Sequence, residues 1–422
     1  MRSLPPGWEW LPLERVLETL PSGAKVQQGW SPQCEKEPAG PEEWGVLKTT
    51  AIQAGAFSDE HHKRLPAHLS PRPGIEVKSG DLLLTNAGPR ARCGIPCLVR
   101  ATRPRLLLSG KVYRFRADES LMDPRFLEYF LLDAETQQAI DQMKTGISDS
   151  GLNLTQSRFA ALPVVVPPLT HQRRIVETLE DHLSRVDAAG DTLRGAISRV
   201  RAWHRGAVDR ILWSSGRGVA MEMIPVGSLL GERMRNGHSA RASKSGRGVR
   251  TLTLTAVTRN DFSDRFTKVT NADVARVEDL WLQPGDILVQ RANTAELVGT
   301  TAIYEGDPGW AIFPDLLIRL RADSSQVLPK YLAGTLRSER AHRALRAKAK
   351  GLAGSMPKID QAAIADVRVP VPSRNEQQRR VEQMEAVDSS RDALLVDLDR
   401  AIKRAERLNR SLLEAAFSGR LA

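Results

Sequence analysis

The chain of 422 residues is poor in the residues and runs that disulfide scaffolds, secretion and membrane insertion require. Its three cysteines, Cys34, Cys93 and Cys97, are too few and too unevenly spaced for a disulfide framework, and they indicate a reducing compartment. No stretch approaches 18 uninterrupted apolar residues, and the N-terminal segment lacks an apolar core of signal-peptide length. We therefore expect a cytoplasmic protein that does not enter a membrane.

The sequence also lacks the common catalytic motifs. It contains no phosphate-binding glycine loop, no G-x-S-x-G and no H-E-x-x-H, and no Asn/Asp-Pro-Pro-aromatic run of the kind that amino-methyltransferases use. A zinc site drawn from the cysteines with His61 and His62 matches no common ligand spacing. These absences predict a protein that is not an enzyme and holds no metal.

Basic residues are in excess. Sixty-one Lys and Arg against 50 Asp and Glu give a formal net charge of +11, which favours a polyanionic partner such as nucleic acid. The alternative is a merely basic soluble protein. Aromatic residues make up only 5% of the chain, which leaves little surface for stacking single-stranded bases.

The sequence contains an internal repeat, because GDLLLTNAG at Gly80 matches GDILVQRAN at Gly285. We call this offset of 205 residues, from Gly80 to Gly285, the repeat shift. It also pairs Leu47–Ile52 with Leu252–Val257, Tyr113–Asp118 with Ile318–Asp323, and Pro124–Leu131 with Pro329–Leu336. The Gln-Arg-Arg at Gln172 matches the one at Gln378, one residue off. The chain therefore contains a duplicated domain.

Each half combines short β-rich runs, including VLKTTAI and GDLLLTN, with few helices. One helix is expected to begin at Pro124 and to run to about Lys144. The fold class is therefore α+β, with two similar, mostly β domains. The expected segments are a first recognition domain over 1–166, a central helix over 167–216, a second domain over 217–371 and a C-terminal helix over 372–422.

Two long helices show an apolar seam at alternating steps of three and four residues, from Leu179 to Ile211 and from Val381 to Ala416. Each would extend about 65 Å. Thr170 and Ser373 are the expected N-caps, and Gly216 and Gly419 are the expected stops. Equal lengths and matched seams predict an antiparallel coiled coil within the chain, with pairing between chains as the alternative.

Two windows contain no acidic residue. Leu82 to Ala117 carries eight basic residues, and Arg235 to Asn260 carries six. Such windows predict contacts with phosphates. Base reading needs forked or bidentate side chains on the loops between strands. The predicted DNA-contacting residues are Lys48, Thr49, Gln53, Asn86, Arg90, Arg92, Ser148, Asn153, Arg241, Lys244, Arg247, Thr253, Thr255, Gln290, Arg291, Asn293, Thr294, Ser355 and Lys358. The two halves differ at most of these positions, which predicts two different half-sites.

Several motifs resemble those of one family. They are LPPGWEWLPL near the start, GDLLLT, GDILVQRANTAELVG, LPVVVPPLTHQRRIVETLEDHLSRVD, and the closing RSLLEAAFSGRLA. With these motifs the whole chain resembles the DNA-specificity (S) subunit of a type I restriction–modification system. The second copy departs slightly, since it reads VPVPSRNEQQRR where the first reads VPPLTHQRR.

The resemblance implies two target-recognition domains that bind a bipartite, asymmetric sequence in double-stranded DNA. It implies that the helix pair sets the spacer between the half-sites and docks two adenine-methyltransferase (M) subunits, which restriction (R) subunits can join. S-adenosylmethionine, ATP and magnesium would then belong to the partners, with no cofactor in this chain. The candidate docking residues are Arg173, Arg174, Glu177, Arg379, Arg380 and Glu382.

Two other interpretations remain open at this point. The chain could be the specificity region of a fused restriction–methylation enzyme, although we expect it to be complete at both ends. It could also be a basic coiled-coil adaptor that binds RNA or another protein.

Overall fold

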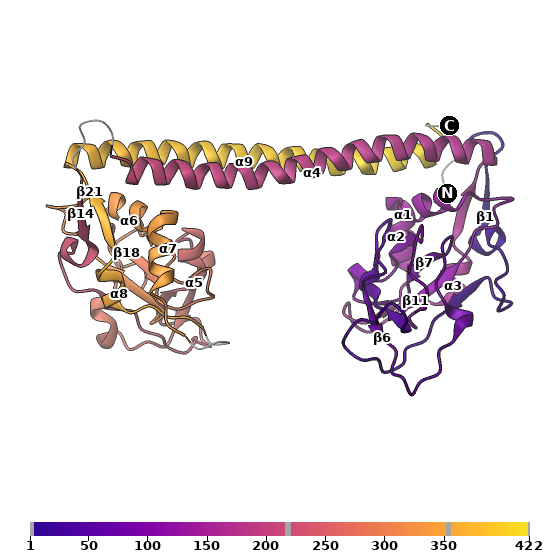
Figure 1. The fold of residues 1–422 in the computed structure, drawn as a ribbon, viewed down its shortest axis with the longest axis horizontal. Coiled ribbons are helices and arrows are strands. Elements are labelled where there is room, and N and C mark those ends of the chain that lie inside the picture. The colour runs from indigo at the N-terminus through magenta and orange to yellow at the C-terminus, as the bar shows by residue number, and fades with distance from the viewer. Residues whose placement is uncertain (1–3, 216–220, 352–355, 421–422) are drawn as a thin grey trace. The chain divides into compact units, whose positions relative to one another are not determined.

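The computed structural model describes residues 4–215, 221–351 and 356–420 of the chain. They form two compact units (Figure 1): unit 1 comprises Met1–Leu193 and Arg400–Ala422, and unit 2 comprises Arg194–Asp399. Each unit contains one mixed α/β body and a stretch of both long helices, α4 (Leu169–Trp213) and α9 (Arg374–Phe417). This architecture confirms the predicted α+β class. In the ranges described, no helix is both long and apolar enough to cross a bilayer.

The body of unit 1 is built from short strands and three short helices. Its strands are β1 (Glu9–Pro12), β2 (Val26–Gln28), β3 (Gly45–Leu47), β4 (Ile52–Gln53), β5 (Ala56–Phe57), β6 (His62–Arg64), β7 (Leu82–Thr85), β8 (Ala87–Gly88), β9 (Pro96–Leu98), β10 (Leu106–Leu107), β11 (Val112–Phe115), β12 (Leu152–Asn153) and β13 (Pro163–Val166). Its helices are α1 (Pro124–Leu132), α2 (Ala134–Met143) and α3 (Gln156–Ala160).

The body of unit 2 repeats this order with fewer strands. Its strands are β14 (Glu222–Pro225), β15 (Arg235–Asn236), β16 (Val249–Leu252), β17 (Thr267–Thr270), β18 (Ile287–Gln290), β19 (Thr301–Ile303), β20 (Leu317–Leu320) and β21 (Arg368–Val371). Its helices are α5 (Leu254–Arg259), α6 (Pro329–Arg337), α7 (Glu339–Ala347) and α8 (Gln361–Ala365).

The central antiparallel sheets of the two units have equivalent strand orders, β2-β11-β7-β9 and β15-β20-β18-β19. Their registers also correspond at the repeat shift, since Leu82 lies opposite Phe115 and Ile287 lies opposite Leu320. Each body also contains a two-stranded antiparallel sheet outside the central one. In it β1 pairs with β13, and in unit 2 β14 pairs with β21. The structure therefore confirms the duplication.

The apolar run Leu82-Leu83-Leu84 is buried on both faces because it separates two cores. Leu82 and Leu84 pack with α1 and α4, whereas Leu83 packs with β3 and β10. In unit 2, Ile287 and Val289 face the helices and Leu288 faces the core beneath β16. Side chains on a strand alternate between faces, so one three-residue apolar run holds two cores together.

Two predictions about local structure were wrong. The expected single helix over 124–144 is two helices, because the Asp133 carboxylate accepts hydrogen bonds from the amides of Glu135 and Thr136 and caps a new helix. The expected strand through VLKTTAI ends at Leu47 and turns into a 3-10 helix. Ala51 and Ile52 are both 0% exposed, and an extended strand would point these neighbours to opposite faces.

A buried glutamine at the start of each long helix makes the same three hydrogen bonds in both units. The Gln172 side-chain carbonyl accepts from the Asp123 amide at 2.8 Å, and its amide group donates to Leu121 O and Pro167 O. The Gln377 carbonyl accepts from the Leu328 amide at 2.8 Å, and its amide group donates to Gln326 O and Pro372 O.

Every partner of Gln172 is related to a partner of Gln377 by the repeat shift, so Gln377 is the true counterpart of Gln172. The predicted match with Gln378 was wrong, because the identical letters Gln-Arg-Arg lie one residue out of register with the structure.

The two long helices run antiparallel within the chain. In unit 1, Ile175 and Leu179 of α4 share a core with Ala416 and Phe417 of α9. In unit 2, Val208 and Leu212 of α4 share a core with Val381 and Met384 of α9. The start of each helix therefore packs beside the end of the other (Figure 1), as the matched seams predicted.

A polar cluster interrupts the seam in unit 2. Asp388 Oδ1 lies 2.5 Å from His204 Nε2, and its carboxylate also accepts hydrogen bonds from Arg337 and Arg391. Burial opposes ionisation of Asp388, but its hydrogen bond to His204 and these two positive charges outweigh that effect and lower its pKa. Because only one register brings these groups together, the cluster favours that pairing over a shifted one.

The helix ends follow the predictions in part. Gly419 has φ +78°, with the Arg420 amide bonded to Ala415 O and the Gly419 amide bonded to Ala416 O, which is a Schellman stop for α9. The Ser373 carbonyl accepts from the Gln377 amide, so Ser373 occupies the N-cap position. The prediction for Thr170 was wrong, because α4 begins at Leu169. Gly216 lies outside the described residues.

Replacing the buried Gln377 by methionine tests the energetic role of the shared hydrogen bonds. The change keeps the side-chain volume but leaves one buried amide and two carbonyls unpaired, each at a cost of about 1–3 kcal/mol. We expect Gln377→Met to lower the free energy of unfolding of unit 2 by at least about 2 kcal/mol in urea titrations. Gln378→Met is the matched control: Gln378 is exposed, and among the described residues its side chain bonds only to Glu382, so its loss should change stability by less than about 0.5 kcal/mol. Equal effects would contradict the structural role of Gln377.

Candidate nucleic-acid interface

The first acid-free window, Leu82 to Ala117, is neutralised by acids from other parts of the chain. Arg90 pairs with Asp141 and Asp149, at 2.6 and 3.0 Å. Arg100 binds Glu128 at 2.7 Å, and Arg105 binds Glu42. Several cations of this window therefore have acidic partners that are distant in sequence and close in the fold, and their contact with phosphates stays a prediction.

Two arginines of the same window lie beside a buried aspartate. Asp81 is 0% exposed, and its carboxylate lies 2.6 Å from Arg116 Nε and 3.7 Å from Arg114 Nη1. In unit 2, Asp286 lies in the same way beside Arg321 and Arg319, at 2.6 and 4.0 Å. Burial lowers the pKa of both Arg114 and Arg319, although the nearby aspartates oppose the shift. This repeated ion cluster holds strands β7 and β18, and it is unavailable to a ligand.

The second window, Arg235 to Asn260, has more basic side chains without an acidic partner among the described residues. Arg235 pairs with Asp279 and Arg250 pairs with Asp264. Arg241, Lys244 and Arg247 are all exposed, and no ion pair joins them to another described residue. They lie on the loop between β15 and β16, which is anchored because the Ser243 amide donates to Val269 O and the Asn271 amide donates to Arg241 O. This loop is a charged surface on a fixed backbone.

Two predicted base-reading amides are buried. Asn86 is 4% exposed and its side chain is hydrogen-bonded to Tyr113, and Gln290 is 0% exposed and donates to Leu254 O and Thr258 Oγ1. Asn86 directly follows β7, and Gln290 is the last residue of β18, so the backbone of both belongs to the body. Their burial removes them from the set of groups that can touch a ligand without rearrangement.

Other predicted residues stabilise the loops that carry them. Arg92 donates to Thr49 O and Ile52 O and to the Gln53 side chain, so it fixes the turn that also contains Lys48. In unit 2, Thr253 Oγ1 donates to Phe266 O. Asn293 donates to Gln290 and accepts from the Thr294 amide. These side chains therefore stabilise the loops of the candidate interface through hydrogen bonds within the body.

Besides Arg90, Arg241, Lys244 and Arg247, six predicted positions are exposed on loops or short elements: Gln53, Ser148, Asn153, Thr255, Thr294 and Lys358. Arg291 is half-buried, and its guanidinium makes no hydrogen bond or ion pair with the described part of the chain. Ser355 lies outside the described residues. The structure places Asn153 and Lys358 at equivalent positions of two hairpins, since Thr145 bridges Asn153 and Lys350 bridges Lys358.

Of the predicted docking residues, five are exposed on the long helices: Arg173, Arg174, Glu177, Arg379 and Glu382. Arg380 is the exception, with 2% exposure. Its guanidinium donates to Leu212 O and Ser214 O, each at 3.0 Å, and thus satisfies carbonyls at the end of α4. Arg380 therefore lies buried at a helix C-terminus, which attracts a cation, and not on the exposed face with the other five.

Glu376 completes this contact in unit 2. Its carboxylate accepts hydrogen bonds from Arg379 and Arg380, at 2.6 Å each. The hydrogen bond from Arg379, with a smaller contribution from Arg380, outweighs burial and lowers the pKa of Glu376 to about 2. The pair therefore stays charged at neutral pH and holds Arg380 against α4.

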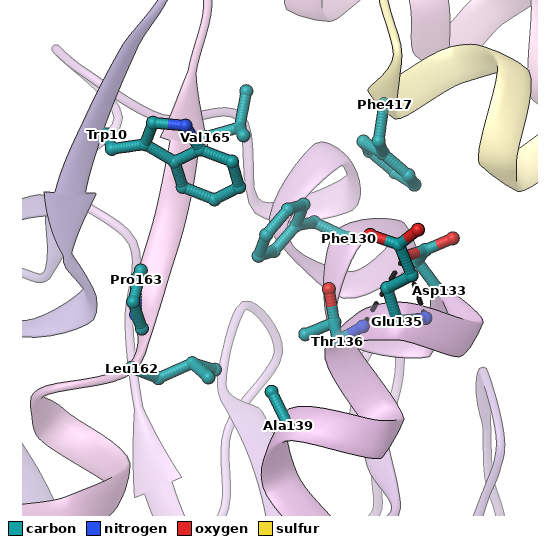
Figure 2. Close-up of a pocket in the computed structure, with 10 residues that line it drawn as sticks. All are labelled: Trp10, Phe130, Asp133, Glu135, Thr136, Ala139, Leu162, Pro163, Val165 and Phe417. Atoms are coloured by element: carbon teal, nitrogen blue, oxygen red, sulfur yellow. Dashed lines mark hydrogen bonds between the residues drawn. The ribbon is translucent and has the colours of Figure 1, made fainter. Parts of the chain in front are cut away.

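The best-defined pocket of unit 1 is apolar and has no arrangement suited to catalysis. Figure 2 shows Trp10, Phe130 and Phe417 around it, with Asp133 and Glu135 at its edge. The Asp133 carboxylate is committed to capping α2. Phe417 meets the rings of Phe126 and Phe130 edge-on, at 5.3 Å each, so the end of α9 covers this body. Among the described residues, no group of three or more His, Cys, Asp or Glu side chains could hold a metal ion.

Sequence reasoning missed one cationic surface. From Arg340 to Ile359 the chain again contains no acidic residue but six lysines and arginines. The signal was present, but Lys358 is the one cation of this segment in the predicted DNA-contacting set, which also includes Ser355. The structure places these residues on α7 and on the hairpin that follows it.

Comparisons with known proteins agree on one family. No protein-family model matches the sequence. The chain is 35% identical over 194 residues to the specificity subunit of the type I restriction enzyme EcoEI from Escherichia coli, a match that covers 46% of this chain and only 32% of that protein. It is 22% identical to the StySPI specificity subunit from Salmonella potsdam, over 99% of this chain and 90% of that protein. It is 27% identical to the EcoKI specificity subunit from Escherichia coli, over 72% of this chain and 67% of that protein.

Solved structures show the same fold. A structure from work on complex assembly and conformational transition of the type I R-M system matches 99% of this chain and 100% of that chain, with a TM-score of 0.74 and 19% identity. The HsdS subunit from Thermoanaerobacter tengcongensis matches 99% of this chain and 98% of that chain, with a TM-score of 0.53 and 19% identity. In sequence the chain is thus similar to specificity subunits of type I restriction enzymes, and its duplicated bodies and two long helices share the fold of these solved structures.

Proposed function

We propose that the chain is a non-catalytic subunit that binds a bipartite, asymmetric sequence in double-stranded DNA, with one half-site for each body. The duplicated scaffold with different loops is the observation that carries this proposal. The strand registers and the buried glutamine contacts recur at the repeat shift, whereas the exposed loops do not. Two copies of one scaffold with different surfaces suit two different half-sites.

The proposed contacts are the exposed members of the predicted set. Arg241, Lys244 and Arg247 would hold phosphates, because they are exposed cations on an anchored loop. Arg291 would read a base, since a guanidinium can bind guanine in a bidentate manner. In unit 1, the corresponding contacts with DNA would be made by three exposed side chains, Gln53, Ser148 and Asn153. Arg90 can join them only if it leaves Asp141 and Asp149.

The long helices have a separate part in the proposal. They would set the spacer between the half-sites and dock two M subunits through exposed residues, which are Arg173, Arg174, Glu177, Arg379 and Glu382. R subunits would join through the M subunits. The chain itself would use no cofactor, and S-adenosylmethionine, ATP and magnesium would act in the partners. The complex would work in the cytoplasm, where the DNA is.

Binding to duplex DNA and to RNA separates this proposal from an RNA-binding adaptor. We expect the purified full chain to bind a mixed-sequence duplex of about 40 bp at least tenfold more tightly than a single-stranded RNA of equal length, with affinity that falls steeply with salt. Fluorescence anisotropy between about 50 and 200 mM salt measures both. Equal or tighter binding to the RNA would contradict the proposal.

Replacement of one arginine tests the assignment of half-sites. Arg291→Ala should weaken specific binding by about 1–3 kcal/mol and relax the sequence preference of one half-site only. Selection of bound duplexes from a random pool, followed by sequencing, measures the preference at both half-sites. Arg276→Ala is the control, because Arg276 is an exposed arginine of the same body outside the predicted set. If both half-sites relax, or neither does, Arg291 has no role in base reading.

A further inference from the structure

Six cations form a basic surface on α7 and the hairpin that follows it. The members of this basic surface are Arg340, Arg343, Arg346, Lys348, Lys350 and Lys358. All but the half-buried Lys348 are exposed. The hairpin is defined by its two bonded ends, where the Lys350 amide donates to Lys358 O at 2.8 Å and the Lys358 amide donates to Lys350 O at 2.9 Å.

The equivalent segment of unit 1 has the opposite net charge, and Arg90 pairs with two of its acids, Asp141 and Asp149. At the repeat shift, segment 339–358 corresponds to segment 134–153, which contains α2 and its hairpin. Six cations and one acid give segment 339–358 a net charge of +5, whereas three acids and one lysine give segment 134–153 a net charge of −2. The scaffold therefore does not require positive charge at these positions, since the other copy folds without it.

Internal partners account for only part of this charge. Arg340 lies 4.7 Å from the centre of the Trp213 ring, and Arg343 pairs with Glu339 at 3.4 Å. Lys348 pairs with Asp366 at 3.3 Å, and the Lys350 side chain, 87% exposed, reaches Asp360 only at 4.0 Å. Arg346 and Lys358 have no ion pair with any described residue.

The two hairpin lysines are directly opposite each other. Because residues 350 and 358 exchange both backbone hydrogen bonds, their side chains leave the hairpin on the same face. Like charges in directly opposite positions destabilise a pair of strands. Their counterparts in unit 1 are the neutral Thr145 and Asn153, also bonded to each other through the backbone. An anion bound between the lysines would relieve this repulsion.

The basic surface adjoins the proposed DNA-contacting loop. Lys358 forms a bridge with Ala292, and the Ile359 amide donates to Arg291 O at 2.8 Å. The backbone of the hairpin is thus bonded to the loop that carries Arg291 and Thr294. A polyanion bound at that loop and longer than a few residues would extend over the hairpin.

We infer that this basic surface binds the DNA backbone beside the second half-site, and that unit 1 has no equivalent contact. The inference rests on the proposed function. It assigns to unit 2 a larger share of the affinity for DNA that does not depend on sequence but does depend on salt. Unit 2 would thus bind any duplex, whereas unit 1 would contribute through its half-site.

Removal of three cations with few internal partners tests the inference. The variant carries Arg346→Gln, Lys350→Thr and Lys358→Asn, of which the last two introduce the residues of unit 1. The affinity of the full chain for a mixed-sequence duplex of about 40 bp is measured by anisotropy at several salt concentrations. Each lost phosphate contact lowers the slope of log K against log salt by about 0.9, so we expect a slope shallower by about 2–3 and affinity at least tenfold weaker.

The control variant Arg404→Gln, Arg407→Gln and Arg410→Gln removes equal charge from exposed positions of α9. It should change the slope by less than about 1, and both variants should match the thermal unfolding of the wild-type chain. If the wild-type chain binds the duplex and the hairpin variant keeps its slope, the basic surface is not a DNA contact, although the proposed function stands. If the hairpin variant instead loses only co-purification with a methyltransferase, the surface binds a protein. A wild-type chain that binds no duplex would overturn both proposals.

Discussion

The structure depends on the burial of the ends of α4 and α9 against the two bodies. Phe417, the last residue of α9, packs between Phe126 and Phe130, and Leu212 is 0% exposed among residues of α6 and α9. Each core therefore includes residues from the start of one long helix and the end of the other. Because these helices contribute apolar side chains to both cores, neither body can be complete without both helices.

The duplication shows which contacts are the same in both units and which surfaces have diverged between them. The glutamine contacts at Gln172 and Gln377 and the ion clusters at Asp81 and Asp286 use the same atoms in both units. Each satisfies buried polar groups, and an unpaired buried group costs more than a hydrogen bond contributes. No such penalty acts on the hairpins at Thr145 and Lys350, which have diverged in charge. The surfaces that differ are those where a change leaves the cores intact.

Sequence patterns predicted the features that repeat along the chain. The repeat shift, the antiparallel seams and the stop at Gly419 follow from periodicity and from glycine chemistry, and the structure has all three. Whether a charged or amide side chain is free could not be predicted in the same way. Arg90 lies in a window without acids, yet Asp141 and Asp149 reach it from a helix and a hairpin more than fifty residues later. Gln290 was predicted on a loop, but it is the last residue of β18 and donates a hydrogen bond to Leu254 O of α5. Such facts depend on tertiary contacts, which local patterns do not contain.

We propose that this one chain carries two recognition bodies with different targets. The most direct test maps methylated adenines across the genome in cells that contain the methyltransferase partner, with and without this chain. We expect a motif of two dissimilar parts separated by a fixed gap, present only when the chain is expressed. A motif that is contiguous, that has two identical halves, or that persists without the chain would contradict the account.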